Sequence, residues 1–278
     1  MTSPYPARRR RAIRLLGARP QSEEILGFLI ALMEIQDSVF QTVGAWRNPD
    51  GPPGGEQPVE PFLRKFISDV IPVATPVLAD AGQALAEADS AALNELLTVQ
   101  MVKMGPGGRG DPTRLGSDDL AGRLGVAEPA VLFYSRAFCQ PLAEVGFGGA
   151  PAPPDDYRGR TCPHCSHLPI VSVLRDEPDN LGGRHLVCSF CATTWPFPRL
   201  TCVHCEETSS DALFHHVSDN DPHIRVDECR TCGVYLKGVD LRKAGNAVPY
   251  VDEIAAVELD VWAQGQGLKK LTTNILGL

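Results

Sequence analysis

The chain has 278 residues, a formal net charge of −8 at pH 7 and 43% hydrophobic residues. This length allows about two domains with cores of their own, and the acidic balance argues against a protein that mainly neutralises nucleic-acid phosphates. The longest apolar run, Ile25 to Met33, is far shorter than the ~20 residues that span a bilayer, so we expect a cytoplasmic protein without membrane insertion.

Near its start the chain carries four consecutive arginines, Arg8 to Arg11. An export signal would need an uninterrupted apolar region after them, but Arg14, Arg19, Glu23 and Glu24 interrupt it. A nucleic-acid contact is the other functional interpretation of such a run, and neither is well supported. The pattern predicts a solvated, frayed N-terminus.

Residues 1–150 are predicted to form an α-helical domain. Ser22 can cap a helix that begins at Glu23 and carries apolar residues toward Trp46. Further helical patterns cover residues 61–71, 81–104 and 115–145, and Pro72 and Pro76 should kink or split the chain after the first of them. The intervening segments 49–58 and 105–110 are predicted to be loops. The second segment is rich in glycine, but it lacks the Gly-Lys-Ser/Thr ending of a phosphate-binding loop.

The second half of the chain changes character after residues 146–159, a segment rich in Pro, Gly and Asp that is predicted to be a linker. Strand-like runs at 169–174 and 185–187 then alternate with cysteine turns, as in zinc ribbons. From Pro249 the pattern is helical again. We therefore predict an α+β protein with an α-helical N-terminal domain (1–150), two tandem rubredoxin-like or zinc-ribbon four-cysteine modules (151–200 and 201–278) and a C-terminal helix in the last of them.

Cysteines are the most informative residues of this sequence. Eight of the nine form Cys-x-x-Cys pairs: Cys162/Cys165, Cys188/Cys191, Cys202/Cys205 and Cys229/Cys232. Two intervening residues let both sulfurs reach one tetrahedral ion at ~2.3 Å, and two such turns complete a four-thiolate shell. Eight sulfurs predict two ions per chain. The ninth, Cys139, lies in an apolar segment and is predicted to be a buried, inert thiol.

The pairs recur at a nearly constant distance, since Cys202 follows Cys162 by 40 residues and Cys229 follows Cys188 by 41. Both units also begin alike, with Thr-Cys-Pro-His-Cys at 161–165 and Thr-Cys-Val-His-Cys at 201–205. A duplicated ribbon favours sequential pairing. Cys162, Cys165, Cys188 and Cys191 would then hold one ion, and Cys202, Cys205, Cys229 and Cys232 the other. An interleaved cross-brace is the alternative.

Disulfides and redox-active pairs are the competing interpretations of these motifs. A Cys-x-x-Cys disulfide closes a short, strained ring that adds little stability, and we find no secretory signal that would indicate an oxidising compartment. A thioredoxin-like pair would stand at the start of a helix in a βαβ context, whereas these pairs stand among turns. Metal binding is therefore the favoured interpretation.

Catalysis and nucleic-acid binding are the two functional classes to weigh against a structural role. All seven histidines lie in the ribbon region: His164, His167, His185, His204, His215, His216 and His223. Four thiolates per ion close each shell, however, which leaves no position for water or substrate. We predict no catalytic residue and expect the histidines to pack and hydrogen-bond around the cysteine turns. No basic stripe lies near the cysteines, so nucleic acid is not predicted as a partner.

Several motifs in the second half resemble one known family. They are Gly-Arg-His-Leu-Val-Cys-Ser-Phe-Cys at 183–191, Thr-Trp at 194–195, Cys-Val-His-Cys at 202–205, Glu-Cys-Arg-Thr-Cys-Gly-Val-Tyr-Leu-Lys at 228–237 and the acidic segment 252–260. In this order and spacing they are similar to the formate dehydrogenase accessory protein (FdhE) family. The resemblance extends from about residue 161 to 267, and the helical half agrees in architecture only.

The resemblance implies a cytoplasmic maturation factor and not an enzyme. Members of this family have a helical N-terminal part and two rubredoxin-like modules, and they bind the catalytic subunit of molybdenum- or tungsten-dependent formate dehydrogenases. All eight paired cysteines match the family motif, so each carries over as a ligand of iron, although zinc accepts the same four sulfurs. A zinc-ribbon scaffold or nucleic-acid-associated protein outside that pathway is the alternative function.

Two features outside the cysteine turns are candidate partner contacts, Tyr235/Lys237 after the last turn and Asp252/Glu253 at the start of the acidic helix. Tyr235 could instead cover a ribbon, and the two acids could complement a helix dipole.

Members of the family that the chain resembles often have glycine directly after the second cysteine of a turn, where a left-handed backbone lets N–H groups approach sulfur. Here Ser166, Ala192 and Glu206 occupy three of these positions and Gly233 the fourth.

Overall fold

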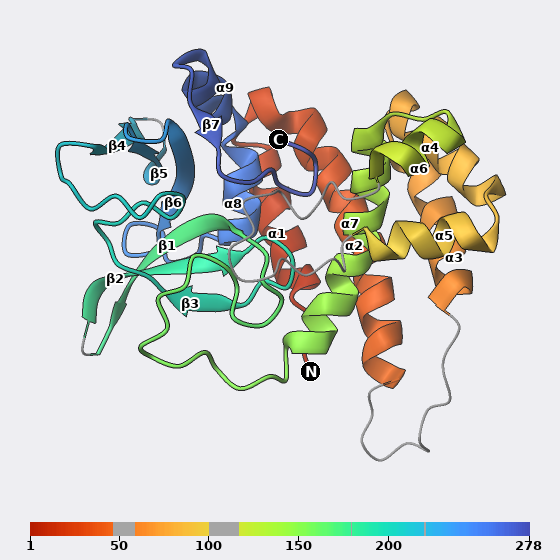
Figure 1. Cartoon of the computed structure of the whole chain (residues 1–278), viewed down its shortest axis with the longest axis horizontal. Coiled ribbons are helices and arrows are strands. Elements are labelled where there is room, and N and C mark those ends of the chain that lie inside the picture. The colour runs from red at the N-terminus through yellow and green to blue at the C-terminus, as the bar shows by residue number, and fades with distance from the viewer. Residues whose placement is uncertain (47–58, 100–116, 179, 220) are drawn as a thin grey trace. The chain divides into compact units, whose positions relative to one another are not determined.

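A computed structural model of the chain describes residues 1–46, 59–99, 117–178, 180–219 and 221–278 (Figure 1). The predicted loops at 49–58 and 105–110 lie outside these residues. The chain forms two compact units. The helical unit comprises Met1–Arg9 and Gly27–Ala150, and the cysteine unit comprises Arg10–Leu26 and Pro151–Leu276. Residues 10–26 therefore belong to the cysteine unit, whereas the sequence predicted them within the helical domain 1–150.

Described elements of the first half are helical throughout. They are α1 (Tyr5–Leu16), a 3₁₀ turn (Pro20–Ser22), α2 (Glu23–Trp46), α3 (Val59–Val70), a 3₁₀ turn (Ile71–Val73), α4 (Pro76–Glu87), α5 (Ser90–Thr98), α6 (Ser117–Leu124) and α7 (Glu128–Phe147). Pro72 lies in the second 3₁₀ turn and Pro76 begins α4, so the predicted split is confirmed. Proline suits a first helical turn because it has no N–H to leave unpaired.

Two of the predicted helices are wrong in extent. The segment 81–104 breaks after α4, where the Asp89 side chain caps α5 by accepting the Ala92 N–H at 2.8 Å. A carboxylate at this position satisfies a free helical N–H and competes with continuation of the preceding helix. The segment 115–145 breaks at Gly125, which has a left-handed φ of 65° that ends α6.

Helix α2 is the longest described helix of the chain and packs against α7. Among the described residues, one helical segment, Pro20–Ala45, is long and apolar enough to cross a membrane by length and composition. In this structure one face of the helix packs on α7: the rings of Phe28 and Phe133 lie 5.7 Å apart, and the Gln36 amide donates to the Ala137 carbonyl at 2.8 Å. Cys139 on α7 is 6% exposed, so the predicted burial of this thiol is confirmed, and burial raises its pKa to about 12.

The expectation of a frayed N-terminus is wrong. Arg8 and Arg11 lie on α1, and both are only 8% exposed. Arg8 pairs with the buried Glu144 of the helical unit at 2.8 Å, and Arg11 pairs with Asp252 of the cysteine unit at 2.5 Å. A buried carboxylate needs a cation close by to offset its lost hydration, so these arginines are anchored by partners far away in the sequence.

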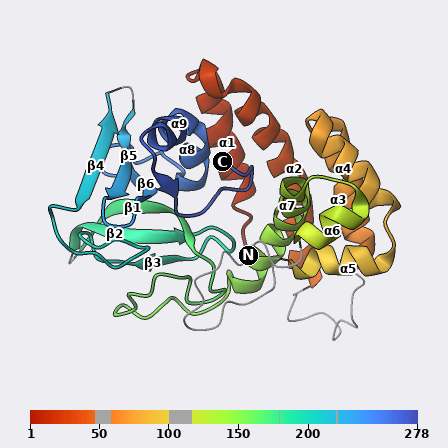
Figure 2. The ribbon, with the colours of Figure 1, turned by 45° about the horizontal axis from the view of Figure 1, so that its top comes forward.

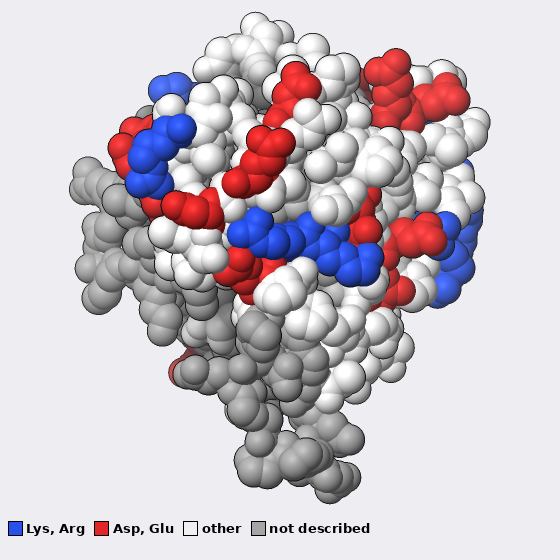
Figure 3. Space-filling model, turned by 90° about the vertical axis from the view of Figure 1, so that its right-hand side faces the viewer, with Lys and Arg blue, Asp and Glu red and all other residues white. Residues whose placement is uncertain are grey.

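Surface charges of the described helices occur as mixed pairs. Figure 3 shows one face of the molecule, on which Lys and Arg side chains lie beside Asp and Glu side chains. Lys65 and Asp69, for example, are 2.6 Å apart on successive turns of α3. Among the described residues on this face, acidic side chains border the row of basic ones.

The cysteine unit is built on one seven-stranded sheet (Figures 1 and 2). Its strands are β1 (Pro169–Glu177), β2 (Asn180–Cys188), β3 (Thr194–Pro196), β4 (Leu213–Ser218), β5 (Asp221–Cys229), β6 (Val234–Asp240) and β7 (Lys269–Lys270). Their order is β3-β2-β1-β6-β5-β4, with β7 also pairing β6. The predicted strands at 169–174 and 185–187 are confirmed.

A parallel pairing between β1 and β6 joins the two four-cysteine modules into this sheet. Ser172 lies opposite Gly238 in that register. A Cβ at Gly238 would lie 2.8 Å from the Ser172 hydroxyl, so the close approach of the two strands requires glycine there. Two tandem ribbons therefore share one sheet, a relationship that their sequential order does not reveal.

Both modules also share one hydrophobic core. Val171 and Val187 of the first module and Ile224 and Val226 of the second belong to the same buried cluster. Helices α8 (Pro249–Ala255) and α9 (Val257–Gly265) lie beside β1, β5 and β6 and contribute Leu259 to it (Figure 2). The single predicted C-terminal helix is thus two helices.

Candidate metal centres

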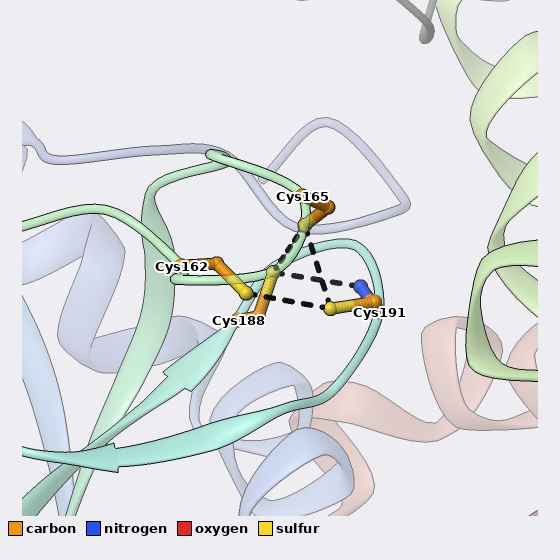
Figure 4. A group of neighbouring side chains, drawn as sticks. All are labelled: Cys162, Cys165, Cys188 and Cys191. Atoms are coloured by element: carbon orange, nitrogen blue, oxygen red, sulfur yellow. Dashed lines mark hydrogen bonds between the residues drawn. The ribbon is translucent and has the colours of Figure 1, made fainter. Parts of the chain in front are cut away.

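The first four-cysteine cluster brings together two chain turns. Cys162 and Cys165 precede β1, Cys188 ends β2, and Cys191 lies in the turn that follows (Figure 4). Their sulfurs point toward one another, with Sγ–Sγ distances of 3.5 Å for Cys162/Cys191, 3.3 Å for Cys165/Cys188 and 3.4 Å for Cys165/Cys191. Four sulfurs around a tetrahedral ion at ~2.3 Å would lie ~3.8 Å apart, so the cluster is close to that size.

A second cluster forms in the same way from the later turns. The Sγ–Sγ distance is 3.7 Å for Cys202/Cys232 and 3.6 Å for Cys205/Cys229. In each cluster the four sulfurs all lie within 4.8 Å of one another. The predicted sequential grouping is confirmed in space, and the interleaved cross-brace is wrong.

Backbone hydrogen bonds show why Cys-x-x-Cys turns present two sulfurs on one side. The Ser166 N–H donates to the Cys162 carbonyl at 2.9 Å and the Cys162 N–H donates to the His167 carbonyl at 2.8 Å. The Glu206 N–H and the Cys202 N–H make the corresponding bonds at 3.0 and 2.8 Å. The repeat seen in the sequence is therefore a repeat of backbone geometry.

All four residues that follow a second cysteine adopt a left-handed backbone. Their φ values are 63° for Ser166, 56° for Ala192, 63° for Glu206 and 67° for Gly233. This conformation costs a residue with a side chain roughly 1–2 kcal/mol. The absence of glycine at three turns thus leaves the shape of the turns intact and stores strain in them.

Chemically, each cluster could hold one ion in a closed shell of four sulfurs. All nine cysteines are free thiols in this structure, and four thiolates in tetrahedral array are the donor set of structural zinc and of rubredoxin-type iron. A closed shell leaves no position for a bound water or substrate. The assignment of these eight residues as ligands stays a prediction from this geometry.

Several histidines of the ribbon region pair with carboxylates across β4 and β5. His215 Nδ1 lies 2.8 Å from Asp227 and His216 Nε2 lies 2.6 Å from Glu228. Burial alone would raise the pKa of Asp227, but the hydrogen bond with His215 and the charges of Arg184 and Arg225 outweigh it and lower the pKa to about 2. These pairs hold adjacent strands together.

The four candidate partner contacts are all buried. Tyr235 is 1% exposed, and Lys237, Asp252 and Glu253 are each 0% exposed. The Tyr235 hydroxyl donates to Asp260 at 2.7 Å. Asp252 accepts the Val248 N–H at 2.7 Å at the start of α8. In this structure the side chains offer a partner no surface, and their partner role stays an untested prediction.

Lys237 and Glu253 belong instead to a buried network of charges. Lys237 Nζ lies 2.6 Å from Asp260 and 3.0 Å from Glu253. Lys270 Nζ lies 2.5 Å from Glu253, whose other oxygen accepts from the Asn274 amide at 3.1 Å. Sequence reasoning missed Lys270 and Asn274 as members of this network. A lysine pair such as 269–270 is typical of an exposed turn.

A small cavity of about 30 Å³ adjoins the second cluster, which is room for about two water molecules. Cys202 and Cys229 line it together with Arg184, Asp227 and His215. It is too small for an organic substrate.

Family models match the two four-cysteine modules of this chain separately. A family model of the FdhE central domain matches residues 161–199 and one of the FdhE C-terminal domain matches residues 200–276. A protein FdhE homolog of Aquifex aeolicus is 27% identical over 275 residues, which cover 93% of this chain and 90% of that protein. One of Pseudomonas putida is 33% identical over 121 residues, which cover 41% of this chain and only 37% of that protein.

The crystal structure of the FdhE protein from Pseudomonas aeruginosa aligns with a TM-score of 0.69 over 98% of this chain and 95% of that one, at 19% identity. It shows that the fold is the same. A helical part followed by two four-cysteine ribbons that could each hold a metal ion defines the class of protein. Within that class, this chain is similar to FdhE proteins over residues 161–276 and shares the fold of one of them.

Proposed function

We propose that this protein is a cytoplasmic accessory factor required for the assembly or activation of respiratory formate dehydrogenase, and that it binds the catalytic subunit of that enzyme. The observation that carries the proposal is that both four-cysteine clusters form within the two segments that match FdhE domains. A maturation factor needs a rigid surface for its client and no substrate pocket of its own.

The closed thiolate shells support a role other than catalysis. Four cysteine ligands per ion leave no open coordination position, so neither ion would activate water or polarise a substrate. We propose that each cluster binds one iron or zinc ion and that binding stabilises its turns, as in other small metal-dependent modules.

Binding of the client would then involve Tyr235, Lys237, Asp252 and Glu253 indirectly. Buried hydrogen bonds and ion pairs of Tyr235, Lys237 and Glu253 hold α8 and α9 against β6. Asp252 binds Arg11 of α1 and His223 of β5. Loss of these bonds would move the helices, and with them whatever exposed residues contact the client.

A deletion strain tests this function. Formate dehydrogenase activity should fall while the transcript level of the enzyme is unchanged, because a maturation factor acts on protein. Restoration by the wild-type gene, and capture of the catalytic subunit by the tagged protein, complete the expected result. Normal activity in a deletion strain that holds no second copy would remove the assignment, and strongly salt-dependent DNA binding would favour a nucleic-acid role.

A further inference from the structure

The two four-cysteine clusters differ in access to solvent. In the first, Cys162, Cys165, Cys188 and Cys191 are 1%, 9%, 0% and 6% exposed. In the second, Cys202 and Cys229 are 8% and 1% exposed, but Cys205 is exposed and Cys232 is half-buried. A duplicated unit has thus produced one sealed cluster and one open cluster.

A ring stack covers the first cluster. His167, two residues after Cys165, stacks on Phe190 with ring centroids 4.4 Å apart and planes 24° from parallel. Both residues are buried, with 6% and 7% exposure. They lie on the two opposing turns that carry the sulfurs, so their stack joins these turns with two buried rings.

The corresponding positions of the second module carry polar residues. Counted from the cysteines, His167 corresponds to Glu207 and Phe190 corresponds to Thr231. The Thr231 hydroxyl donates to the Glu207 carboxylate at 2.8 Å, on the exposed side of the turns. A hydrogen bond between small solvated groups joins the same two turns but excludes far less water than two stacked rings.

A second difference lies at the residue after the third cysteine of each module. The Tyr250 hydroxyl of α8 donates to the Ser189 carbonyl, and the tyrosine is 8% exposed. At the corresponding place, Arg230 is exposed and lies over the Phe214 ring at 3.5 Å. A buried tyrosine thus contacts the second turn of the first module, whereas the second module has an exposed cation–π contact at that place.

We propose that the two clusters have different roles: the Cys162/Cys165/Cys188/Cys191 cluster is a sealed structural metal site, and the Cys202/Cys205/Cys229/Cys232 cluster is an open site where a soft metal ion exchanges and where external thiols or chelators reach the sulfurs at Cys205 and Cys232. The stacked rings of His167 and Phe190 determine the difference. This inference rests on the proposed function only in requiring that both clusters bind an ion.

Metal release from the wild-type full-length protein tests the proposal. Protein loaded with two Zn²⁺ ions without oxygen is mixed with excess 4-(2-pyridylazo)resorcinol, and the coloured complex is followed with time. We expect two phases of one ion each, with the fast rate at least about tenfold above the slow rate, since local opening limits access to a buried site. Release of both ions at one rate would overturn the proposal.

Alkylation identifies which site empties first. Iodoacetamide added during the fast phase forms a sulfur–carbon bond at each freed thiolate, with loss of iodide, and peptide mass spectrometry locates the modified cysteines. Cys205 and Cys232 should be modified first. Earlier modification of the first cluster would reverse the assignment, whatever the outcome of the formate dehydrogenase experiment.

Substitutions that swap the covering residues between the two modules test the role of the stacked rings in metal release. Glu207→His with Thr231→Phe should slow the fast phase, and His167→Glu with Phe190→Thr should make the slow ion leave faster. Thr208→His, at an exposed neighbouring position, is the control and should change neither rate. A fast phase that Glu207→His with Thr231→Phe leaves unchanged would overturn the role of the rings. The wild-type rates and alkylation map decide the order of release even where a variant fails to fold.

Discussion

Lys237 Nζ lies 2.6 Å from Asp260 Oδ2, and neither side chain reaches solvent, with exposures of 0% and 3%. Lys237 also donates to the Glu253 and Ala256 carbonyls. The Lys237 ammonium on β6 therefore hydrogen-bonds to acceptors at the end of α8 and near the start of α9. A buried charge with this many partners is costly to leave unpaired.

Lys237→Met should destabilise the cysteine unit by about 3–5 kcal/mol, because it removes one cation from a buried network that still contains Glu253 and Asp260. Urea unfolding followed by near-UV dichroism measures the loss. Lys243→Met is the matched control, since Lys243 is exposed, and it should cost less than about 1 kcal/mol. A similar small loss for both variants would show that the network contributes little.

The stability contributed by Glu253 should depend on pH. Burial alone would raise the pKa of Glu253, but the charges of Lys237 and Lys270 outweigh it and lower the pKa to about 2 from an ordinary 4.5. A lowered pKa means that the stabilisation is complete above pH 4.5 and is lost as the pH falls from 4.5 toward 2.

Glu253→Gln tests this, because the neutral amide cannot titrate. Its free energy of unfolding should lie well below that of wild type at pH 7, and the difference should shrink as the pH falls below 4.5. Bound metal is measured in both proteins at each pH, because acid also removes metal from thiolates. A difference that is the same at pH 3 and pH 7 would contradict the lowered pKa.

The left-handed turns at the cysteines predict that adding a methyl group at one turn and removing one at another have opposite effects on stability. Gly233→Ala should cost about 1 kcal/mol, because φ is 67° there and a Cβ would meet nothing within 4 Å, so that only backbone strain acts. Ala192→Gly, at φ 56°, should gain up to about 1 kcal/mol. Thermal unfolding of the metal-loaded proteins measures both, and equal signs for the two changes would refute the strain argument.

Metal analysis should find two ions per chain and one in the Cys188→Ser, Cys191→Ser double variant. Because Val187 and Val226 share one core, loss of the first ion should destabilise the whole cysteine unit and not the first module alone. Far-UV dichroism and limited proteolysis should show that the helical unit keeps its helices. Selective proteolysis of residues 161–199 with the second module intact would show that the modules fold separately.

How far the sequence predicted the structure is clearest at the cysteines. Their spacing alone predicted the two clusters and the partners within each, because a Cys-x-x-Cys turn is a local geometry and a duplication preserves it. Prolines likewise predicted the break between α3 and α4 through local sterics. The arginine run at 8–11 predicts a frayed end, because the carboxylate partners of Arg8 and Arg11 lie more than 130 residues away in the chain.

By itself, the sequence determined the helical and ribbon halves and the cysteine turns, and it favoured the sequential grouping of the eight sulfurs, because these features follow from periodicity and short-range geometry. Tertiary structure alone decided that the ribbons share one sheet through β1 and β6, that Lys237 and Glu253 are buried, and that His167 and Phe190 cover only one cluster. These features depend on contacts between distant segments, and burial then decides whether the same residue type is a solvated surface charge or a buried ion pair.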